Sequence, residues 1–537
     1  MAGRIQIETV GNKSLFPYTE PQFSYFSSLF KKHTCFARNN HHIKYNELFD
    51  FGNQTTVNVP QNLGDLLNRV ILKVTLPQLP SIPGGYDANG IYSSQHDENT
   101  PGFQPVRIYY QESVGHALIE YIDFKIGNQT IERLTGETLQ IHSEISDDEG
   151  CQVIHSQLIN KYPYSIRRYA VSSATVGLNG STPGSQVADA GVSKSLELLI
   201  NIPFYFTKNP KLYIPLCSIY KQEISFDVKL RKFEDVIVEY IQPNYEEFYN
   251  NSFVPIVNWG VTKVNNQFQP YLNNMKIEDG EFIFERTFLD TIEKLKLKNS
   301  TIDILMTEMQ VEEFNMNEEL GKVPEKKFNL SFKNPVKELY FIIQRQNVDT
   351  GESNYISATT FNTIRGSTYV TPFNYDNSSD IHVQHQNVGD YDALLPNRPV
   401  SHSGTWDNLE YLKLTLDGNE VITRETGDFQ TLGITQFTTH HKRTPQTRKI
   451  YMYSFALKPD EWEPSGHVNF SNIKNQILDV HLFSSETFLN RLTIPGTPGT
   501  LTNPVPDRWY VFPRVIRVYA KSYNILRVKD GIATKIF

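Results

Sequence analysis

The sequence predicts an all-β protein made of two similar sandwich or barrel domains in tandem. Three observations predict this fold: the composition favours strands, apolar and polar residues alternate in many short segments, and one stretch of sequence occurs twice. Among 537 residues, 33 Phe and 29 Tyr stand beside 30 Gly and 29 Pro. Aromatic residues fit the pleated surface of a sheet, and Gly and Pro mark turns. Many short strands joined by such turns are typical of a β-sandwich or a β-barrel.

Strict alternation of apolar and polar residues marks the clearest strands. It is best developed in residues 70–76, 224–230 and 412–416. A period of two indicates a strand with one buried and one solvated face. Similar patterns predict further strands at residues 117–126, 195–204, 236–240, 281–288, 338–344, 450–457, 477–483 and 515–528. The best candidate for a helix, residues 137–145, is short.

An internal repeat predicts the tandem arrangement. Residues 127–137 align without gaps on residues 418–428, and both copies hold Gly, Asn, Ile, Arg, Thr and a second Gly at the same positions. Gly-Asn at the end of a strand favours a hairpin turn, because both residues tolerate positive φ. Further along, residues 226–230 correspond to residues 478–482. We therefore expect two homologous β-domains joined near residues 298–303; the alternative is that two hairpins converged on one turn sequence.

Four long segments without alternation separate the strands. They are rich in Gly, Asn, Ser, Pro and Tyr and cover residues 77–105, 143–193, 345–407 and 484–513. Loops of this length inside compact domains are usually functional or interacting. We expect them to gather at one face or end of each sandwich.

Composition excludes several classes of protein. The 51 Lys and Arg against 59 Asp and Glu give a net charge of −8, which argues against tight nucleic-acid binding. No window approaches about 18 consecutive apolar residues, so a membrane span is not expected. The first residues lack the apolar core of a secretory signal. Three widely separated cysteines cannot build a disulfide framework and suit a reducing compartment.

No pattern of residues predicts a catalytic, metal or cofactor site. Neighbours on a strand point to opposite faces, so the pairs His41-His42 and His440-His441 do not chelate a metal there, and we expect solvated loop histidines instead. Nucleophile elbows, phosphate-binding loops and dinucleotide-binding motifs are missing from the sequence. A carboxylate pair for glycoside hydrolysis stays open, because such a pair is formed in space rather than in sequence.

The segment of residues 21–37, PQFSYFSSLFKKHTCFA, is an unusual motif near the N-terminus. It resembles the opening of the major capsid proteins of nucleocytoplasmic large DNA viruses, although Lys31 and Lys32 replace the usual arginines. Family-like pieces follow at residues 64–67, 288–291, 451–459, 464–466, 469–471 and 519–527. The residues that carry these motifs are Phe30, Lys31, Lys32, His33, Phe36, Gly64, Asp65, Tyr453, Phe455, Pro459, Pro464, Gly466, Tyr523 and Asn524.

The resemblance implies a double jelly roll: two tandem eight-stranded antiparallel sandwiches with long loops and few short helices. It divides the chain into an N-terminal arm, a first jelly roll and a second jelly roll, at residues 1–25, 26–298 and 303–537. It implies a structural protein, not an enzyme, without catalytic residues, metal or cofactor. Three copies would form a pseudo-hexagonal capsomer that tiles the icosahedral shell of a large double-stranded DNA virus, in the virion, after synthesis and assembly in the host cytoplasm.

The resemblance also implies partners. These are the other copies of a homotrimer, neighbouring capsomers, minor capsid and penton proteins, and the inner viral membrane or its proteins, with no direct contact to nucleic acid. Because large interfaces are rich in aromatic residues, we expect loop aromatics in the trimer contacts, with packing inside one subunit as the alternative. The candidates are Tyr92, Tyr109, Tyr110, Tyr369, Phe373 and Tyr375.

Two functions of other classes are weighed beside a capsid protein. A carbohydrate-binding or carbohydrate-active β-sandwich protein is compatible with the fold class and with Trp406 beside Asp407 in an aromatic loop. A receptor-binding spike is less compatible, because such spikes usually carry a fibrous shaft and the sequence has no shaft repeat.

Overall fold

The computed structural model describes two sandwiches and the segments that join them. The described residues are 32–45, 49–60, 63–86, 92–97, 99–100, 104–106, 108–111, 113–146, 157–161, 195–241, 260–262, 266–316, 325–345, 409–445, 449–482 and 514–537, with the single residues 4, 24, 26, 155, 264, 373 and 375.

Two four-stranded antiparallel sheets make the first sandwich in the described part of the chain. Their strand orders are β1-β15-β3-β10 and β2-β12-β8-β9, and the short β11 adds to β3. The first sheet consists of β1 (Phe36–Lys44), β15 (Asp279–Leu289), β3 (Leu66–Leu76) and β10 (Leu196–Ile202), with β11 (Ile214–Pro215). The second consists of β2 (Gln54–Val59), β12 (Ile224–Leu230), β8 (Ile119–Ile126) and β9 (Gln129–Thr135).

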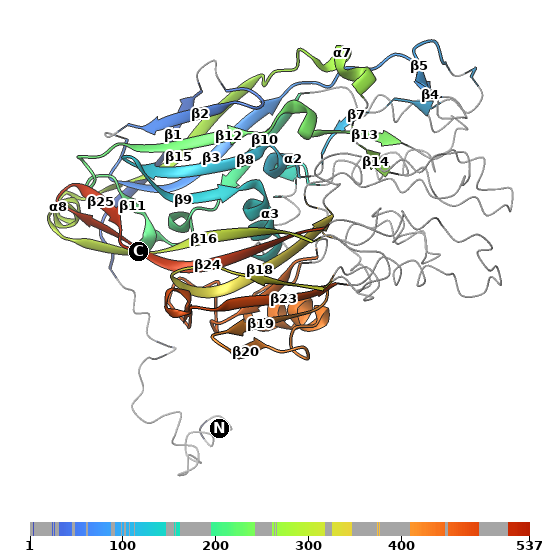
Figure 1. Ribbon diagram of the computed structural model, residues 1–537. Coiled ribbons are helices and arrows are strands. Elements are labelled where there is room, and N and C mark those ends of the chain that lie inside the picture. The colour runs from blue at the N-terminus through green and yellow to red at the C-terminus, as the bar shows by residue number, and fades with distance from the viewer. Residues whose placement is uncertain are drawn as a thin grey trace.

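The second sandwich repeats this arrangement strand by strand. Its sheets have the orders β16-β24-β18-β21 and β17-β23-β19-β20, and β22 and β25 add to the first of them. The first sheet consists of β16 (Ile302–Met316), β24 (Arg514–Lys529), β18 (Pro335–Arg345) and β21 (Tyr451–Ser454), with β22 (Val468–Asn469) and β25 (Ile532–Lys535). The second consists of β17 (Glu325–Asn329), β23 (Gln476–Leu482), β19 (Leu409–Leu416) and β20 (Asn419–Ile422). Both units are jelly rolls, and they lie side by side (Figure 1).

The repeated sequence forms the same hairpin in both sandwiches. Gly127 begins the turn between β8 and β9 at φ 59°, and Gly418 lies in the turn between β19 and β20 at φ 85°. The predicted hairpins are present, although Asn128 and Asn419 do not adopt positive φ; in the second turn Asp417 takes that conformation, at φ 47°. The correspondence of residues 226–230 with 478–482 is also structural, because β12 pairs with β8 as β23 pairs with β19.

The second glycine of the repeat is required by close backbone contact. A Cβ at Gly136 would lie 2.2 Å from the carbonyl oxygen of His116, and a Cβ at Gly427 would lie 1.8 Å from that of Leu412. These separations are far below van der Waals contact, so only glycine fits. In the first sandwich the segment after the hairpin therefore crosses the backbone at His116, just before β8. In the second sandwich it crosses the backbone at Leu412, within β19.

Alternating residues of the strands build the two cores. Phe124, Phe226 and Phe284 are fully buried and stack between the sheets of the first sandwich. The second core is mostly aliphatic, with Leu412, Leu414, Leu478, Val480 and Val518 among its buried residues. Packing of sheet on sheet, rather than the short helices, therefore holds each unit together.

The two ends of the strands differ (Figure 1). One end carries two small three-stranded sheets, formed by β14 (Gly260–Thr262), β13 (Ile237–Ile241) and β7 (Ile108–Tyr110), and by β5 (Tyr92–Ser93), β4 (Gly85–Tyr86) and β6 (Gln104–Pro105). The opposite end, called the base below, carries α8 (Thr291–Asn299), β25 and the C-terminus. The predicted long loops lie largely outside the described residues.

Each segment that periodicity predicted as a strand overlaps an observed strand, although many of the other strands were not predicted. β12 has the predicted bounds, and the predicted helix is α3 (Gly136–Ser146). The strand predicted at 117–126 begins only at Ile119, because α2 (Val114–Ala117) precedes it, and the one predicted at 450–457 ends at Ser454. The periodicity missed β1, whose nine residues are almost all exposed, and β16, which is only partly buried.

Candidate functional site

The two sandwiches meet along an apolar seam, formed where α3 of the first lies on the outer face of the first sheet of the second. Ile141 and Ile145 of α3 share one buried cluster with residues of β18, β21 and β24. The partner side chains on that sheet are at most 3% exposed: Tyr340, Ile342, Met452 and Tyr519. This outer face would otherwise lie open to water, so the first sandwich supplies its cover.

Polar contacts across the seam fix the position of α3. Arg517 of β24 donates to Glu137 of α3 over 3.3 Å, and the Tyr519 hydroxyl also donates to Glu137. Burial and the nearby Glu137 carboxylate hold the pKa of Tyr519 well above its usual value. Burial opposes the charge of Arg517, yet Glu137 and Glu313 raise its pKa, so Arg517 stays charged.

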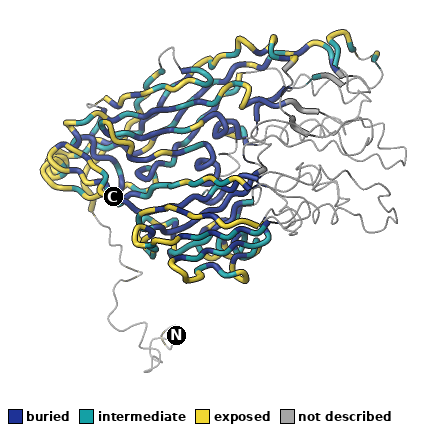
Figure 2. The backbone as a smooth tube through the Cα atoms, in the orientation of Figure 1, coloured by how far each residue is buried: buried dark blue, intermediate teal, exposed yellow. Residues whose placement is uncertain are grey.

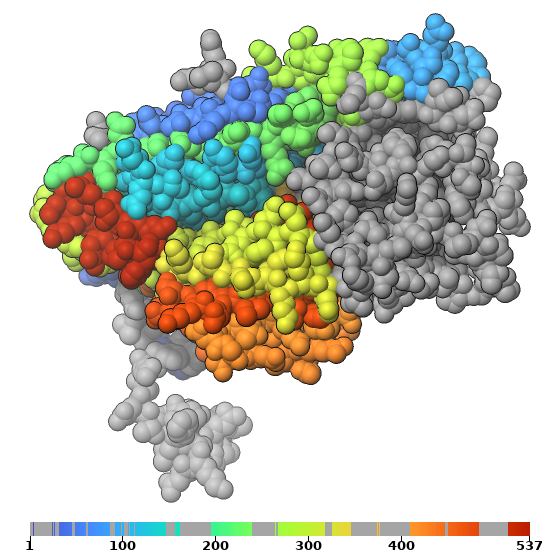
Figure 3. Space-filling model, viewed as in Figure 1, coloured from blue at the N-terminus to red at the C-terminus, as the bar shows by residue number. Residues whose placement is uncertain are grey.

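The second unit also covers part of the first core. Leu526 and Val528 near the end of β24 and Ala533 of β25 belong to the same buried cluster as the first sandwich. The amide of Ala533 donates to the Gln222 side chain over 2.7 Å. The space-filling view shows this C-terminal segment lying against the first sandwich at the base (Figure 3).

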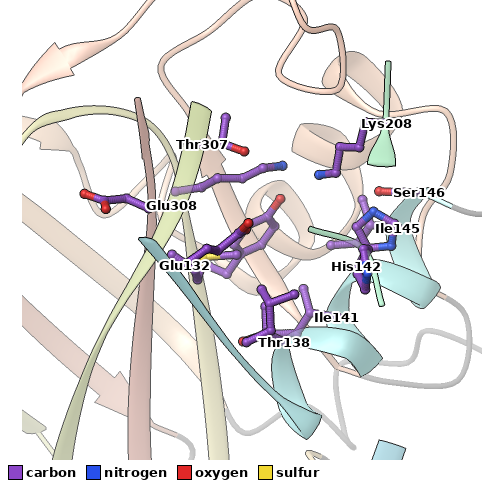
Figure 4. A pocket seen from close by; sticks show the side chains of 14 residues that line it. Glu132, Thr138, Ile141, His142, Ile145, Ser146, Lys208, Thr307 and Glu308 are labelled. Carbon is purple, nitrogen blue, oxygen red and sulfur yellow. The ribbon is translucent and has the colours of Figure 1, made fainter. Parts of the chain in front are cut away.

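A groove lined by both charged and apolar side chains opens between the sandwiches beside the seam (Figure 4). Its volume is about 40 Å³, room for a few water molecules. Glu132 of β9 accepts a hydrogen bond from the Tyr205 amide, and burial raises the pKa of Glu132 to about 8. Lys208, from the loop after β10, and Glu308, from β16, line this groove from opposite sandwiches, and the Glu308 carboxylate points away from it to pair with Lys535. The groove therefore places charged groups of both sandwiches at the junction.

A buried charge network lies under the seam in the second sandwich. Lys521 donates to Glu338 over 2.5 Å, and His441 donates to Glu338 over 2.9 Å and to Asp460 over 2.8 Å. Burial disfavours the ionised Glu338, but Lys521 and His441 hold its pKa well below the usual value. Burial likewise opposes a charged His441, yet the two carboxylates raise its pKa. The expectation that His441 is a solvated loop histidine is wrong, because it bridges two acids in the interior.

The base combines exposed apolar residues with lysines. In α8, Ile292 is 79% and Leu295 52% exposed, while Lys294 pairs with Asp65 at 2.6 Å. Asp65 also accepts the amide of Leu289 and thereby fixes the end of β15 to the turn before β3. Figure 2 shows α8 as an exposed tip at this end of the molecule. α8 has no buried residue among those that the structure describes, and exposed apolar residues on such a helix indicate a contact surface.

Known proteins are similar to this chain in sequence and in architecture. Residues 24–277 match the family model described as the major capsid protein N-terminus, and residues 293–534 match the model of the large eukaryotic DNA virus major capsid protein. The chain belongs to the major capsid proteins of large DNA viruses.

Relatives of this capsid protein cover its whole length. The major capsid protein of Chrysochromulina ericina virus is 24% identical over 99% of this chain and 98% of its own, and that of Phaeocystis pouchetii virus is 22% identical with the same coverage. Among solved structures, the PBCV-1 capsid model has a TM-score of 0.56 at 16% identity, covering 96% of this chain and 100% of its own. The Faustovirus major capsid protein has a TM-score of 0.54 at 12% identity, covering 95% and 93%. The structural likeness agrees with the double jelly roll expected from the motifs.

Family-motif residues of the second jelly roll gather around one buried lysine. Lys337, which the sequence did not single out, donates to the carbonyl of Pro459 over 2.6 Å and lies over the ring of Tyr523. Burial and the nearby Lys521 hold the pKa of Lys337 well below its usual value. Tyr453 and Phe455 pack edge to face beside it. The signal that could have found Lys337 was its place directly before Glu338, the first residue of the strand predicted at 338–344, but periodicity alone gives such a lysine no special role.

Other motif residues fix chain geometry or lie at the surface. Gly466 has φ 141°, and a Cβ there would lie 2.7 Å from the carbonyl oxygen of Phe455. Asn524 is 1% exposed and bonds to the backbone of Phe537, which holds the C-terminus. Pro464 is exposed, and Gly64 contacts the Arg286 side chain. In the N-terminal motif Lys32, His33 and Phe36 are exposed, and Phe30 and Lys31 lie outside the described residues.

Most of the aromatic residues expected in trimer contacts pack inside the subunit. Phe373 and Tyr375 are each 1% exposed, and Tyr109 and Tyr110 are each 7% exposed. Side chains with so little exposed area have no surface to offer a second subunit, so their expected role is corrected to self-packing. Tyr92 is half-buried against Phe268, and Tyr369 lies outside the described residues.

The described residues contain no cluster of three or more metal-ligating side chains, and no described helix is long and apolar enough to cross a membrane. The charged groups near the seam are instead paired with one another. The apolar seam and its ion pairs therefore hold the two jelly rolls in one orientation.

Proposed function

We propose that this major capsid protein forms homotrimers, each a pseudo-hexagonal capsomer of an icosahedral shell. One observation carries the proposal: a single chain holds two jelly rolls of identical strand order, joined side by side. Three chains then supply six similar units around a three-fold axis, because head-to-tail contacts close into a ring. The fixed seam supports this role, since a wobbling pair of units could not form a regular outline.

The base is proposed as the inner face of the shell. Ile292 and Leu295 of α8 are exposed there, and the N-terminal arm, residues 1–25, leads to β1, whose first residue, Phe36, pairs with Leu289 just before α8. We place contacts with minor capsid and penton proteins, and with the inner viral membrane or its proteins, on this face. Contacts with neighbouring capsomers would use the lateral faces of the capsomer. Synthesis and assembly would occur in the host cytoplasm.

A purely structural role is part of the proposal. No catalysis, cofactor or direct nucleic-acid contact is included, because the charged groups described at the junction serve as structural pairs. The carbohydrate-active alternative has no support from the described residues, and Trp406 lies outside them. A glycan array and a hydrolysis screen would test it.

Mass and shape in solution test the proposal. Light scattering of the purified full chain should give three times 61.8 kDa, and negative-stain images should show hexagonal particles. A monomer at micromolar concentration would overturn it. Obligate interfaces typically exceed roughly 2,000 Å² and persist at that concentration.

A further inference from the structure

The groove between the two sandwiches gathers three basic side chains from separate elements. His142 lies on α3, Lys521 lies on β24, and Lys208 lies between two short 3₁₀ turns. These turns, η1 (Tyr205–Thr207) and η2 (Pro210–Leu212), contact β16 of the second sandwich. All three basic side chains line the same cavity (Figure 4). The junction therefore brings together basic groups that lie far apart in the sequence.

Unlike the paired charges at the seam, two of these basic groups lack a partner. Among the described residues, the side chains of Lys208 and His142 form no hydrogen bond and no ion pair. Lys521 donates one of its three ammonium protons to Glu338, over 2.5 Å. The groove therefore holds hydrogen-bond donors that no described acceptor satisfies.

The positive charges also act on one another across the groove. Burial, and then the charges of Lys208 and Lys521, hold the pKa of His142 well below its usual value. Burial opposes a charged Lys521 as well, yet Glu338 and Asp460 raise its pKa. Like charges held near one another cost free energy, and an anion between them removes that cost.

The acidic residues that line the groove do not supply this anion. Glu132 accepts the Tyr205 amide over 2.9 Å, and with its pKa raised by burial to about 8 the carboxyl is largely neutral near pH 7. A neutral carboxyl can itself donate a hydrogen bond. Glu308 pairs with Lys535 and points away from the groove. The groove is therefore short of negative charge at neutral pH.

We propose that this groove binds a phosphate group, held by Lys208, His142 and Lys521. Donors that come from three separate elements suit an anion with several acceptor oxygens, and charged donors form the strongest such hydrogen bonds. The volume of about 40 Å³ admits a small ion, whereas sites for organic ligands of drug size measure about 300–1,000 Å³. The bound phosphate would join the two jelly rolls of one chain, so the proposal holds with or without the trimer.

Titration of the full chain with sodium phosphate tests this site. At constant ionic strength, set with sodium chloride, calorimetry near pH 7 should show one saturable site per chain with a Kd of about 1 mM or tighter. Lys208→Gln and His142→Ala should each weaken binding about tenfold or more, because each removes a donor to the anion. Lys208→Arg keeps the charge and should retain most of the affinity. Lys232→Gln, which replaces an exposed lysine outside the groove, is the matched control and should bind as the wild type does.

Glu132→Gln separates a ligand site from a structural ion pair. The glutamine keeps an acceptor for the Tyr205 amide and removes the acid, so phosphate should bind at least as tightly as in the wild type. If Lys208 served only to neutralise Glu132, the wild type would show no saturable phosphate binding, and the proposal would be wrong.

Two further results would overturn the site. Equal phosphate binding by the wild type and Lys208→Gln would mean an adventitious ion only. An equal rise in melting temperature with chloride and with phosphate, at one ionic strength, would mean a general salt effect. Glycerol phosphate, as a second probe, identifies the source of the ligand: equal affinity for both probes assigns the site to the phosphate end of a larger molecule, and binding of inorganic phosphate alone assigns it to the free ion.

Discussion

Glu137 of α3 and Arg517 of β24 are 380 positions apart in the sequence, yet they form an ion pair of 3.3 Å across the seam. Their side chains are only 10% and 15% exposed. The pair joins the two jelly rolls at the place where α3 covers the second sandwich. Its loss should therefore weaken the contact between the two jelly rolls.

Removing the charge of Glu137 should weaken the contact between the two jelly rolls and lower the free energy of unfolding. We expect Glu137→Gln to cost about 1–3 kcal/mol, because it leaves Arg517 short of one partner in a buried place. Arg517 keeps Glu313 and Gln344 as partners, which limits the loss. Thermal unfolding measures it, and a double-mutant cycle with Tyr519→Phe should show coupling. Asp303→Asn, which breaks an exposed pair with Arg527, is the control and should change little. Equal melting of Glu137→Gln and wild type would contradict the role of the pair.

The charge network around His441 should make stability depend on pH. The folded state raises the pKa of His441, so its contribution is fully present below the usual pKa of about 6.5 and is lost as the pH rises through the raised value. The folded state lowers the pKa of Glu338, so that contribution is lost when the pH falls through the lowered value. The stability gap between wild type and His441→Gln should therefore be largest near pH 6 and shrink at alkaline pH.

Melting temperatures across pH 5 to 10 measure this gap. His33→Gln replaces an exposed histidine and serves as the control, for which no pH-dependent gap is expected. A gap for His441→Gln that grows with pH would mean that the buried imidazole is neutral, contrary to its two carboxylate partners.

The repeated glycines should differ sharply in their tolerance of alanine. Gly136→Ala and Gly427→Ala place a Cβ within 2.2 Å and 1.8 Å of a backbone oxygen, so we expect insoluble protein or a loss of several kcal/mol. Gly418→Ala meets no atom within 4 Å and pays only for its positive φ, about 1 kcal/mol. Soluble yield and melting temperature compare the three. A mild effect at Gly427 would show that the backbone can move apart there.

Deleting residues 1–25 should separate trimer formation from shell formation. The described strands begin at Phe36, so the core and the seam do not need the arm. We expect trimers of unchanged melting temperature that fail to form shells with the remaining capsid components. Light scattering and electron microscopy check the two steps. If the deletion instead unfolds the protein, the arm is part of the core.

The prediction of secondary structure succeeded where one face of a strand is buried within its own sandwich. β12 alternates without interruption because its even-numbered residues face the core of the first sandwich, while its odd-numbered residues are polar and point to the other face of the sheet. β1 escaped prediction because both of its faces carry polar residues, and β16 because it is only partly buried. The motif residues were found by resemblance, but Lys337 and His441 were not, since their partners come from distant parts of the chain.

By itself, the sequence determined that the chain is a tandem of two β-sandwiches with repeated hairpins, because a period of two and a turn sequence are local properties. Only the tertiary structure decided which face of each sheet is covered. That outcome depends on how α3 meets β18, β21 and β24, strands that follow it far along the chain, and no local pattern of residues encodes this contact.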